Sequence, residues 1–244
     1  MLKLQNITLD IPVYNLAIPK TLNRYVIDHI LKTKKKEKNF KRILDNITFE
    51  LNPGESLGIM GKNGSGKTSL LRTLAGVYKT FSGKLILPPK VASFLDLNAC
   101  VNNELSGIEN ILLITKFLEK DKKILEKKQI EDIIEFSGLK DSIFNLTKTY
   151  SSGMRGRLMF ASSTYFSKDL ILIDENIFVG DKSFHKQAVE KINKMKKKGC
   201  SIILASHSEE LLKKYCEKGL YLKKGIQENY GEIDKVIKRY NQDE

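Results

Sequence analysis

The chain has 244 residues, and its 42 Lys and Arg outnumber its 29 Asp and Glu, which gives a formal net charge of +13 at pH 7. With 41% hydrophobic residues, 16 Gly and only 5 Pro, the composition excludes a disordered or collagen-like polymer and predicts a globular protein of one large or two small domains. Three scattered cysteines are too few for a disulfide framework or a zinc site, so the sequence indicates a reducing compartment.

The N-terminal region predicts strands that flank an inserted segment. Its first residues, MLKLQNITLD, contain no apolar core, so we expect no secretory signal. Apolar and polar residues alternate over 2–13 and again over 47–51, which is typical of half-buried antiparallel strands. Residues 22–30 carry apolar side chains at helical spacing and lead into a run of lysines. We therefore expect a basic amphipathic insertion at about 15–42 within an antiparallel β region over 1–55.

From Ser56 onward, apolar strands alternate with helices. An apolar segment at 57–60 leads into a glycine-rich turn and a helix, and further apolar strands at 170–173 and 202–205 are separated by a predicted helix at about 183–198. Continuous apolar strands that alternate with helices are typical of a parallel sheet covered on both faces. The sequence therefore predicts an α/β fold with a mainly parallel core sheet.

A helical region divides this core. Helical patterns at 108–118 and 130–136 predict an insertion over roughly 105–165. The densest apolar patch, 111–118, is interrupted by Lys116 and falls far short of the roughly 20 residues that cross a bilayer. We therefore expect that the chain does not form a membrane channel by itself.

A phosphate loop is the strongest motif in the chain. The segment Gly61–Thr68 matches GxxxxGK[ST] and lies between a predicted strand and a predicted helix, as this motif requires. Its glycines let the backbone curl around phosphate oxygens, so that N–H groups and the helix N-terminus face the negative charge. Lys67 is expected to bind the β and γ phosphates, and the Thr68 hydroxyl to bind Mg²⁺. The residues expected to contact the nucleotide here are Gly61, Asn63, Gly64, Ser65, Gly66, Lys67, Thr68 and Ser69.

Two carboxylates end the predicted strand at 170–173. Asp174 is expected to hold Mg²⁺, and Glu175 to polarise the water that attacks the γ phosphate. Without the phosphate loop upstream, ordinary solvated acids would be the better interpretation. Together with the loop, the pair favours nucleotide hydrolysis.

Four motifs in this order resemble ATP-binding cassette (ABC) ATPases. Tyr150-Ser151-Ser152-Gly153-Met154 takes the place of the family signature LSGGQ, and Asp181 fits the family's D-loop. His207, at the end of an apolar strand, fits its switch histidine. The resemblance covers nearly the entire chain and implies a phosphate-loop NTPase fold, the ABC nucleotide-binding domain, that binds ATP and Mg²⁺.

The resemblance also implies a role for a second copy of the chain. ATP bound at Lys67 of one copy is expected to be capped by Ser151, Ser152 and Gly153 of the other, in a head-to-tail homodimer. A helix N-terminus adds N–H donors and a favourable dipole at the γ phosphate. His207 is expected to contact that phosphate and to hold the attacking water in line with Glu175.

Three sequence segments are similar to those of one subfamily. Glu104–Asn110, Tyr150–Met154 and Phe178–Asp181 look like the ATPase subunits of bacterial polysaccharide exporters, which handle lipid-linked O-antigen, capsule or teichoic acid. The resemblance implies a short form without a C-terminal carbohydrate-binding domain. It divides the single domain, 1–244, into the N-terminal β region, a RecA-like core at 56–97 and 166–244, and a helical subdomain at 98–165 that carries the signature.

The chain departs from the family pattern at two places. ABC ATPases usually place a Gln between the phosphate-loop helix and the helical subdomain, but residues 91–104 contain none, so Asp96 or Asn98 is expected to take its place at Mg²⁺. An aromatic ring usually stacks on adenine, and Tyr14 and Phe40 are the candidates, with strand packing as the alternative role of either ring.

The basic surplus lies mostly in two runs, at 32–42 and 191–198. Positive charge of this kind fits nucleic acid, an anionic membrane, an acidic ligand or a solvated face. The first run follows the amphipathic pattern, so we expect it near the anionic cytoplasmic leaflet or a membrane partner. The second run lies at a predicted helix end, where contact with solvent and with the helix dipole is enough to explain the positive charge.

These patterns favour an ATP-hydrolysing motor for polysaccharide export, peripheral on the cytoplasmic face of the bacterial inner membrane. Its expected partners are a second copy and a separate transmembrane permease subunit. The alternatives are the ATPase of a drug exporter or importer and an ABC ATPase that acts on nucleic acid. We expect no nucleic-acid partner, because the chain has one cassette and no sustained heptads. A GTPase is disfavoured because the sequence contains no NKxD motif.

Overall fold

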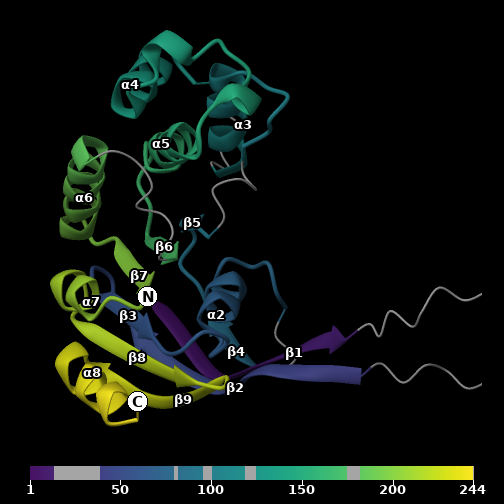
Figure 1. The fold of residues 1–244 in the computed structure, drawn as a ribbon, viewed down its shortest axis with the longest axis vertical. Helices are drawn as coiled ribbons and strands as arrows, with labels where there is room; N and C mark the ends of the chain where they lie inside the picture. Colours follow the sequence, from purple (N-terminus) through teal and green to yellow (C-terminus); the bar gives the residue numbers. More distant parts are fainter. Residues whose placement is uncertain (14–38, 80–81, 96–100, 119–124, 175–181, 244) are drawn as a thin grey trace, which may run out of the picture.

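The computed structural model describes residues 1–13, 39–79, 82–95, 101–118, 125–174 and 182–243. These residues form a mixed β-sheet whose strands follow the order β4-β1-β2-β9-β8-β3-β7-β6-β5 (Figure 1). The strands are β1 (Leu2–Val13), β2 (Asn39–Leu51), β3 (Ser56–Met60), β4 (Ser82–Ile86), β5 (Val91–Phe94), β6 (Leu170–Asp174), β7 (Ser201–Ala205), β8 (Lys218–Lys223) and β9 (Ile226–Glu232).

The helices fall into two groups. One group packs along the sheet: α2 (Lys67–Leu74), α6 (Lys182–Lys197), α7 (Glu209–Tyr215) and α8 (Ile233–Gln242). The other lies beyond the β5–β6 edge and includes two short 3₁₀ turns (Figure 1): α3 (Gly107–Leu118), α4 (Lys127–Ser137), η1 (Lys140–Ser142), η2 (Thr147–Thr149) and α5 (Ser152–Ser163). No helix in the described ranges is long and apolar enough to cross a membrane.

The N-terminal strands are antiparallel, as the alternating pattern predicts. β1 pairs with β2 from Leu2 opposite Leu51 onward, and β4 pairs with the other edge of β1. Leu4 and Ile7 are both buried although they are three positions apart, because Asn6 has a φ of 53° and the register shifts between them. A β-bulge of this kind inserts one residue and restores the apolar face.

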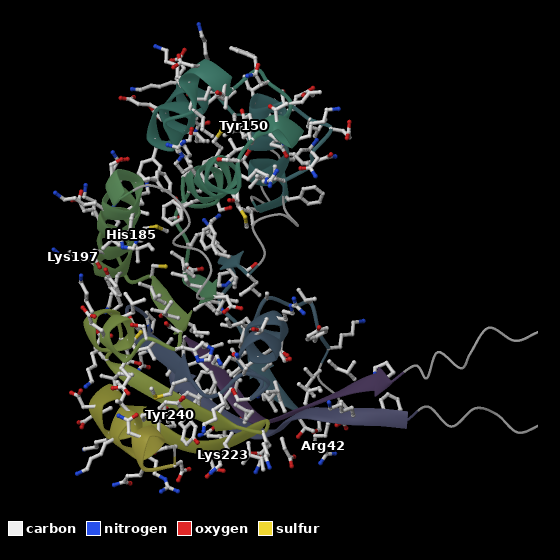
Figure 2. All side chains as sticks on the ribbon, in the orientation of Figure 1. Arg42, Tyr150, His185, Lys197, Lys223 and Tyr240 are labelled. Atoms are coloured by element: carbon white, nitrogen blue, oxygen red, sulfur yellow. The ribbon has the colours of Figure 1, made fainter. Side chains whose placement is uncertain are left out.

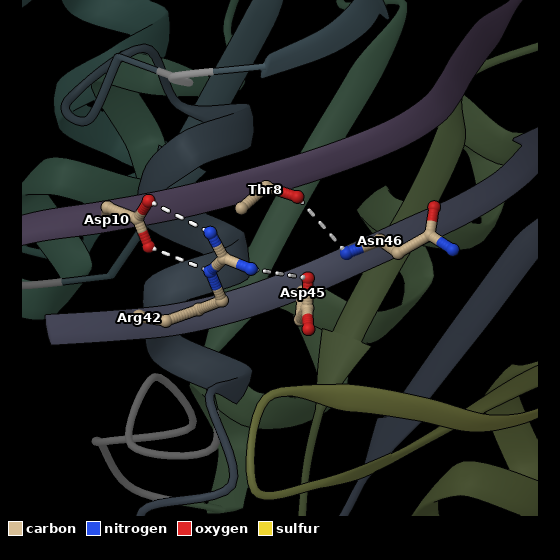
Figure 3. A network of polar contacts seen from close by, with 5 residues as sticks. All are labelled: Thr8, Asp10, Arg42, Asp45 and Asn46. Atoms are coloured by element: carbon tan, nitrogen blue, oxygen red, sulfur yellow. Dashed lines mark hydrogen bonds and ion pairs between the residues drawn. The ribbon is translucent and has the colours of Figure 1, made fainter.

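An ion-pair network joins β1 and β2 near the ends of the strands that flank residues 14–38 (Figure 3). Arg42 donates from Nε to Asp10 Oδ1 over 3.1 Å and from a terminal nitrogen to Asp45 Oδ1 over 3.4 Å. The Asn46 amide donates to Thr8 Oγ1 over 3.3 Å. Exposed ion pairs add little to stability. We interpret this network as a set of contacts that keeps the two strands in register.

The parallel core is confirmed and is buried on both faces. β3 pairs in parallel with β7 and β8, and β6 pairs in parallel with β5 and β7. Ile171 and Ile173 pack into one apolar cluster, whereas Leu170 and Leu172 pack into the other cluster across the sheet. Successive residues of a strand point to opposite faces, which explains why both must be apolar here.

Four phenylalanines connect the outer helical group to the core. The Phe160 ring of α5 stacks on Phe94 of β5 at a centroid distance of 5.4 Å and on Phe136 of α4 at 6.1 Å. It also meets the edge of Phe184, near the start of α6, at 5.9 Å. Phe160 therefore lies at the junction of β5, α4, α5 and α6.

Replacing Phe160 with Ala should remove this junction. Because the ring is only 4% exposed, we expect the free energy of unfolding to fall by about 3–5 kcal/mol in urea denaturation. The matched control is Phe144→Ala, since Phe144 is 76% exposed and its loss should cost less than about 0.5 kcal/mol. Equal losses in the two variants would contradict this assignment.

Candidate nucleotide-binding site

The segment Gly61–Thr68 forms a loop after the end of β3 and runs into the first turn of α2, as its sequence predicts. It borders a cleft of about 570 Å³. The residues that line the cleft are Lys41, Ile43, Asn63, Gly64, Ser65, Gly66, Lys67, Thr68, Ser69, Asp174 and His207. Besides the loop, three strands contribute to the cleft: β2 passes beside it, β6 ends at it with Asp174, and β7 leads to His207.

The Lys67 ammonium lies inside the loop. Its Nζ donates to the Gly61 carbonyl over 2.5 Å and to the Lys62 carbonyl over 3.3 Å, and it lies 3.4 Å from His207 Nε2. The Lys67 residue is 9% exposed. The loop carbonyls therefore hold a largely buried cation next to the histidine that the sequence predicts at this site.

Two oxygen ligands meet at the other side of the loop. Thr68 Oγ1, in the first turn of α2, donates to Asp174 Oδ2, at the end of β6, over 3.0 Å. Hydroxyl and carboxylate oxygens are the ligands that Mg²⁺ prefers in proteins. The predicted pair is therefore brought together by the fold, although 106 residues separate its members in the chain.

The loop suits an anion in two further respects. Ser65 Oγ is buried and has no hydrogen-bond partner among the described residues, and Ser65 lines the cleft. The N-terminus of α2 follows directly, and its N–H groups and dipole favour negative charge. Lys41 and Lys67 add positive charge, against one carboxylate among the lining residues, Asp174. The donor set therefore fits the phosphates of a nucleotide.

The turn between β8 and β9 supports the phosphate loop through a backbone hydrogen bond. The Gly225 amide donates to the Ser65 carbonyl over 2.9 Å, and the Gly225 carbonyl accepts from the Asp45 amide over 2.9 Å. Gly225 has a φ of 83°, and a Cβ there would lie 2.2 Å from the Ile43 carbonyl oxygen. Only glycine fits this position, because the phosphate loop, β2 and the turn share backbone contacts there.

The signature residues lie in the outer helical group. Ser151 caps the N-terminus of α5, where its Oγ accepts from the Met154 amide over 3.2 Å. Tyr150 is buried and donates to the Ser142 carbonyl, and Figure 2 shows it in this group, at the opposite end of the molecule from Arg42. Ser151, Ser152 and Gly153 do not line the cleft of their own chain, which is the arrangement that a role in a second copy requires.

Several predicted site residues lie outside the described residues: Tyr14, Asp96, its alternative Asn98, Glu175 and Asp181. Their roles stay predictions. Phe40 is described, but it is 47% exposed and is not among the residues that line the cleft. Lys41 and Ile43 line it instead. The sequence analysis missed both, and the only signal for them was their place in a strand just upstream of the phosphate loop.

The described cysteines take no part in this chemistry. Burial raises the pKa of the Cys200 and Cys216 thiols to about 12 each. A reactive cysteine needs a thiolate, so neither supplies a nucleophile.

A family comparison agrees with this site. The family model for ABC transporters matches residues 44–177, which is more than half of the chain. The chain therefore belongs to the ABC transporter family, and the resemblance drawn from its motifs is confirmed.

Three relatives are ATP-binding proteins by name. The chain is 36% identical to the O-antigen export system ATP-binding protein RfbE of Yersinia enterocolitica, over 91% of this chain and 94% of that protein. It is 34% identical to the ATP-binding protein BexA of Haemophilus influenzae, over 88% and 97%. The teichoic acids export ATP-binding protein TagH of Bacillus anthracis is 35% identical over 98% of this chain, which spans only 42% of that protein.

Solved structures show the same fold. The dimeric post-hydrolysis state of the ATP-binding cassette MJ0796, bound to ADP and Pi, superposes with a TM-score of 0.72 at 19% identity, over 96% of this chain and 99% of that one. An ATP-binding subunit of an ABC transporter gives a TM-score of 0.73 at 18% identity, over 99% and 93%. These matches confirm the predicted fold class.

Gly225→Ala should disturb the loop through its support. The matched control is Gly199→Ala, because Gly199 has a similar φ of 92° but open space around its missing Cβ. We expect the control to lose about 1–2 kcal/mol of unfolding free energy from backbone strain alone. Gly225→Ala should lose a further 1–3 kcal/mol or so, because the added Cβ meets backbone. Equal losses in urea denaturation would show that the contact with Ile43 is not a constraint.

Proposed function

We propose that the protein is the ATP-hydrolysing subunit of an ABC transporter that exports a lipid-linked polysaccharide across the cytoplasmic membrane. The observation that carries the proposal is the convergence of Lys67, the Thr68–Asp174 pair and His207 on one cleft. RfbE, which this chain matches over most of its length, is named for O-antigen export, and this name supports the choice of substrate class.

The loop binds the phosphates of ATP through its N–H groups and through Lys67, with Gly61, Asn63, Gly64, Ser65, Gly66, Thr68 and Ser69 around them. Thr68 and Asp174 would hold Mg²⁺, and Asp96 would serve there in place of the absent Gln. When bound, Mg²⁺ neutralises charge on the β and γ phosphates. Glu175 polarises the attacking water, and His207, beside Lys67 in the cleft, contacts the γ phosphate and aligns that water.

A second copy completes the site. Ser151, Ser152 and Gly153 of one protomer cap the ATP of its partner, and Asp181 serves as the D-loop aspartate. Ser151 and Ser152 are exposed at the N-terminus of α5, where N–H donors and the helix dipole favour a phosphate. Because the capping residues belong to another chain, closure of the homodimer over ATP is part of the catalytic cycle.

The motor docks on a separate transmembrane permease and works peripherally on the cytoplasmic face of the inner membrane. An apolar groove of about 490 Å³ beside α3 and α5 supports a protein partner. Phe117 lines it and is 80% exposed, and exposed apolar surface of this kind is typical of protein contacts. The basic run at 32–42, apart from Lys41 at the cleft and Arg42 in its ion pairs, lies near the anionic leaflet or the membrane partner, and no nucleic acid takes part.

Replacing Glu175 with Gln should lower steady-state phosphate release at least about 100-fold, because the activating base is lost. ATP binding and ATP-dependent dimerisation should persist in calorimetry and size exclusion. Glu135→Gln, at an exposed position of α4, is the matched control and should keep full turnover. Unaltered turnover of Glu175→Gln would remove Glu175 as the activating residue.

The same variant tests the substrate class. Isolated from membranes, Glu175→Gln should carry a transmembrane subunit with it, and lipid-linked glycan should accumulate in the cells that express it. Co-purifying ribosomes or DNA would contradict export, and an intact subunit without accumulated glycan would favour another transporter class.

The two basic runs provide a matched test of membrane contact. Replacing Lys34, Lys35 and Lys36 with Gln should abolish salt-sensitive sedimentation with anionic vesicles, because each lysine near such a surface contributes about 1 kcal/mol. Replacing Lys194, Lys197 and Lys198, which are exposed on and just after α6 (Lys197 is labelled in Figure 2), should leave sedimentation intact. Equal loss in both triple variants would contradict the proposal.

A further inference from the structure

The residues that lead into the signature are bound to the segment that precedes α3. The Thr147 amide donates to the Leu105 carbonyl over 2.9 Å, and the Lys148 amide donates to the Asn103 carbonyl over 3.1 Å. The signature therefore does not follow a free loop, because the chain just before it is paired to another segment of the outer helical group.

The Asn110 side chain, on α3, lies at the centre of this pairing. It is 0% exposed. Its Oδ1 accepts from the Asn102 amide over 2.8 Å, and its Nδ2 donates to the Asn102 carbonyl over 3.0 Å and to the Ser106 carbonyl over 2.9 Å. A side-chain amide carries one acceptor and two donor hydrogens, so both ends of this amide hold the backbone that precedes α3.

The Thr147 hydroxyl extends this network to the signature side. It is buried, and Oγ1 donates to the Asn102 carbonyl over 2.7 Å, across 45 residues of the chain. The same oxygen accepts from Asn110 Nδ2 over 3.4 Å. A buried polar group is costly unless it is paired, so a network of this kind favours a single arrangement of the segments that it joins.

The three residues from Thr147 to Tyr150 carry this arrangement to the signature. The Tyr150 amide donates to the Thr147 carbonyl over 3.1 Å. The Tyr150 ring is buried, and a Cβ at Gly107, the first residue of α3, would lie 2.4 Å from the Tyr150 hydroxyl. Ser151, the next residue, caps α5. The start of the signature is therefore packed directly against the start of α3.

We propose that Asn110 and Thr147 are positioning residues for the signature: their buried hydrogen bonds hold Ser151, Ser152 and Gly153 where the ATP of a second copy meets them. The proposal rests on the proposed function, since it requires that these residues cap the ATP of the partner. Neither Asn110 nor Thr147 is among the residues that line the cleft. The proposal thus gives a role to Asn110 that the chemistry of the phosphate loop does not supply.

The test measures ATP-dependent dimerisation by size exclusion in the Glu175→Gln chain. Thr147→Val keeps the shape of the side chain but removes its hydroxyl, so it should raise the protein concentration needed for half-dimerisation at least about fivefold. Thr147→Ser keeps the hydroxyl and should stay within about twofold of the parent. Asn110→Leu should cause a larger loss than Thr147→Val. ADP lacks the phosphate that the second copy caps, so its affinity in calorimetry should stay within about twofold in every variant.

A stability control separates position from folding. Ile133→Val removes a methyl group from another fully buried side chain of the outer helical group, so it should lower the urea midpoint and leave dimerisation intact. Should Asn110→Leu not fold, the comparison of the two Thr147 variants decides by itself.

Three results would overturn the proposal. Unaltered dimerisation of Thr147→Val would show that the hydroxyl does not position the signature. An equal loss in Thr147→Ser would show that the hydroxyl is not the group involved, and an equal loss in Ile133→Val would show that the effect comes from stability. Failure of the proposed function is distinguishable, because the Glu175→Gln parent would then stay monomeric with saturating ATP.

Discussion

The backbone contact between the phosphate loop and the β8–β9 turn is the constraint on which the cleft depends. Gly225 joins the Ser65 carbonyl to the Asp45 amide, so a loop that has no sheet partners of its own is fixed to two strands. Such a contact excludes a Cβ at the turn and determines where β2 passes the phosphates. One set of main-chain hydrogen bonds thus fixes the phosphate loop relative to the β2 residues that line the cleft.

The cleft and the signature occupy different parts of one chain. The cleft sits on the sheet, whereas α5 belongs to the outer helical group, which meets the core partly through the rings around Phe160. The start of α6 contacts α5 through the rings of Phe184 and Phe160, so these rings join the two groups of helices directly.

Local patterns were sufficient to predict the phosphate loop, the parallel strands and the helices, because each depends on neighbours in sequence. The loop motif identified Lys67 and Thr68, and the carboxylate after the 170–173 strand identified Asp174, which the fold brings to Thr68. The apolar alternation of β1 survived a bulge at Asn6 because polar asparagine tolerates positive φ. These features are encoded within a few residues of one another.

What sequence reasoning missed depends on distant segments. Lys41 and Ile43 were overlooked in favour of Phe40 because a residue type was sought, whereas the side that each strand residue faces is decided by a bulge and by Gly225, about 180 residues away in the chain. The β8–β9 hairpin carries no motif, yet it supports the loop. Functional side chains could be predicted from their motifs, whereas the main-chain contacts that position them could not.

The antiparallel pair β1–β2 connects residues 14–38 to a strand that borders the cleft. Asn39 begins β2 and Ile43 lies four residues further on, a distance of roughly 13 Å along an extended strand. The Arg42 network lies between these two points, so a shift in the register of β1 and β2 at this end would displace the strand residues that line the cleft.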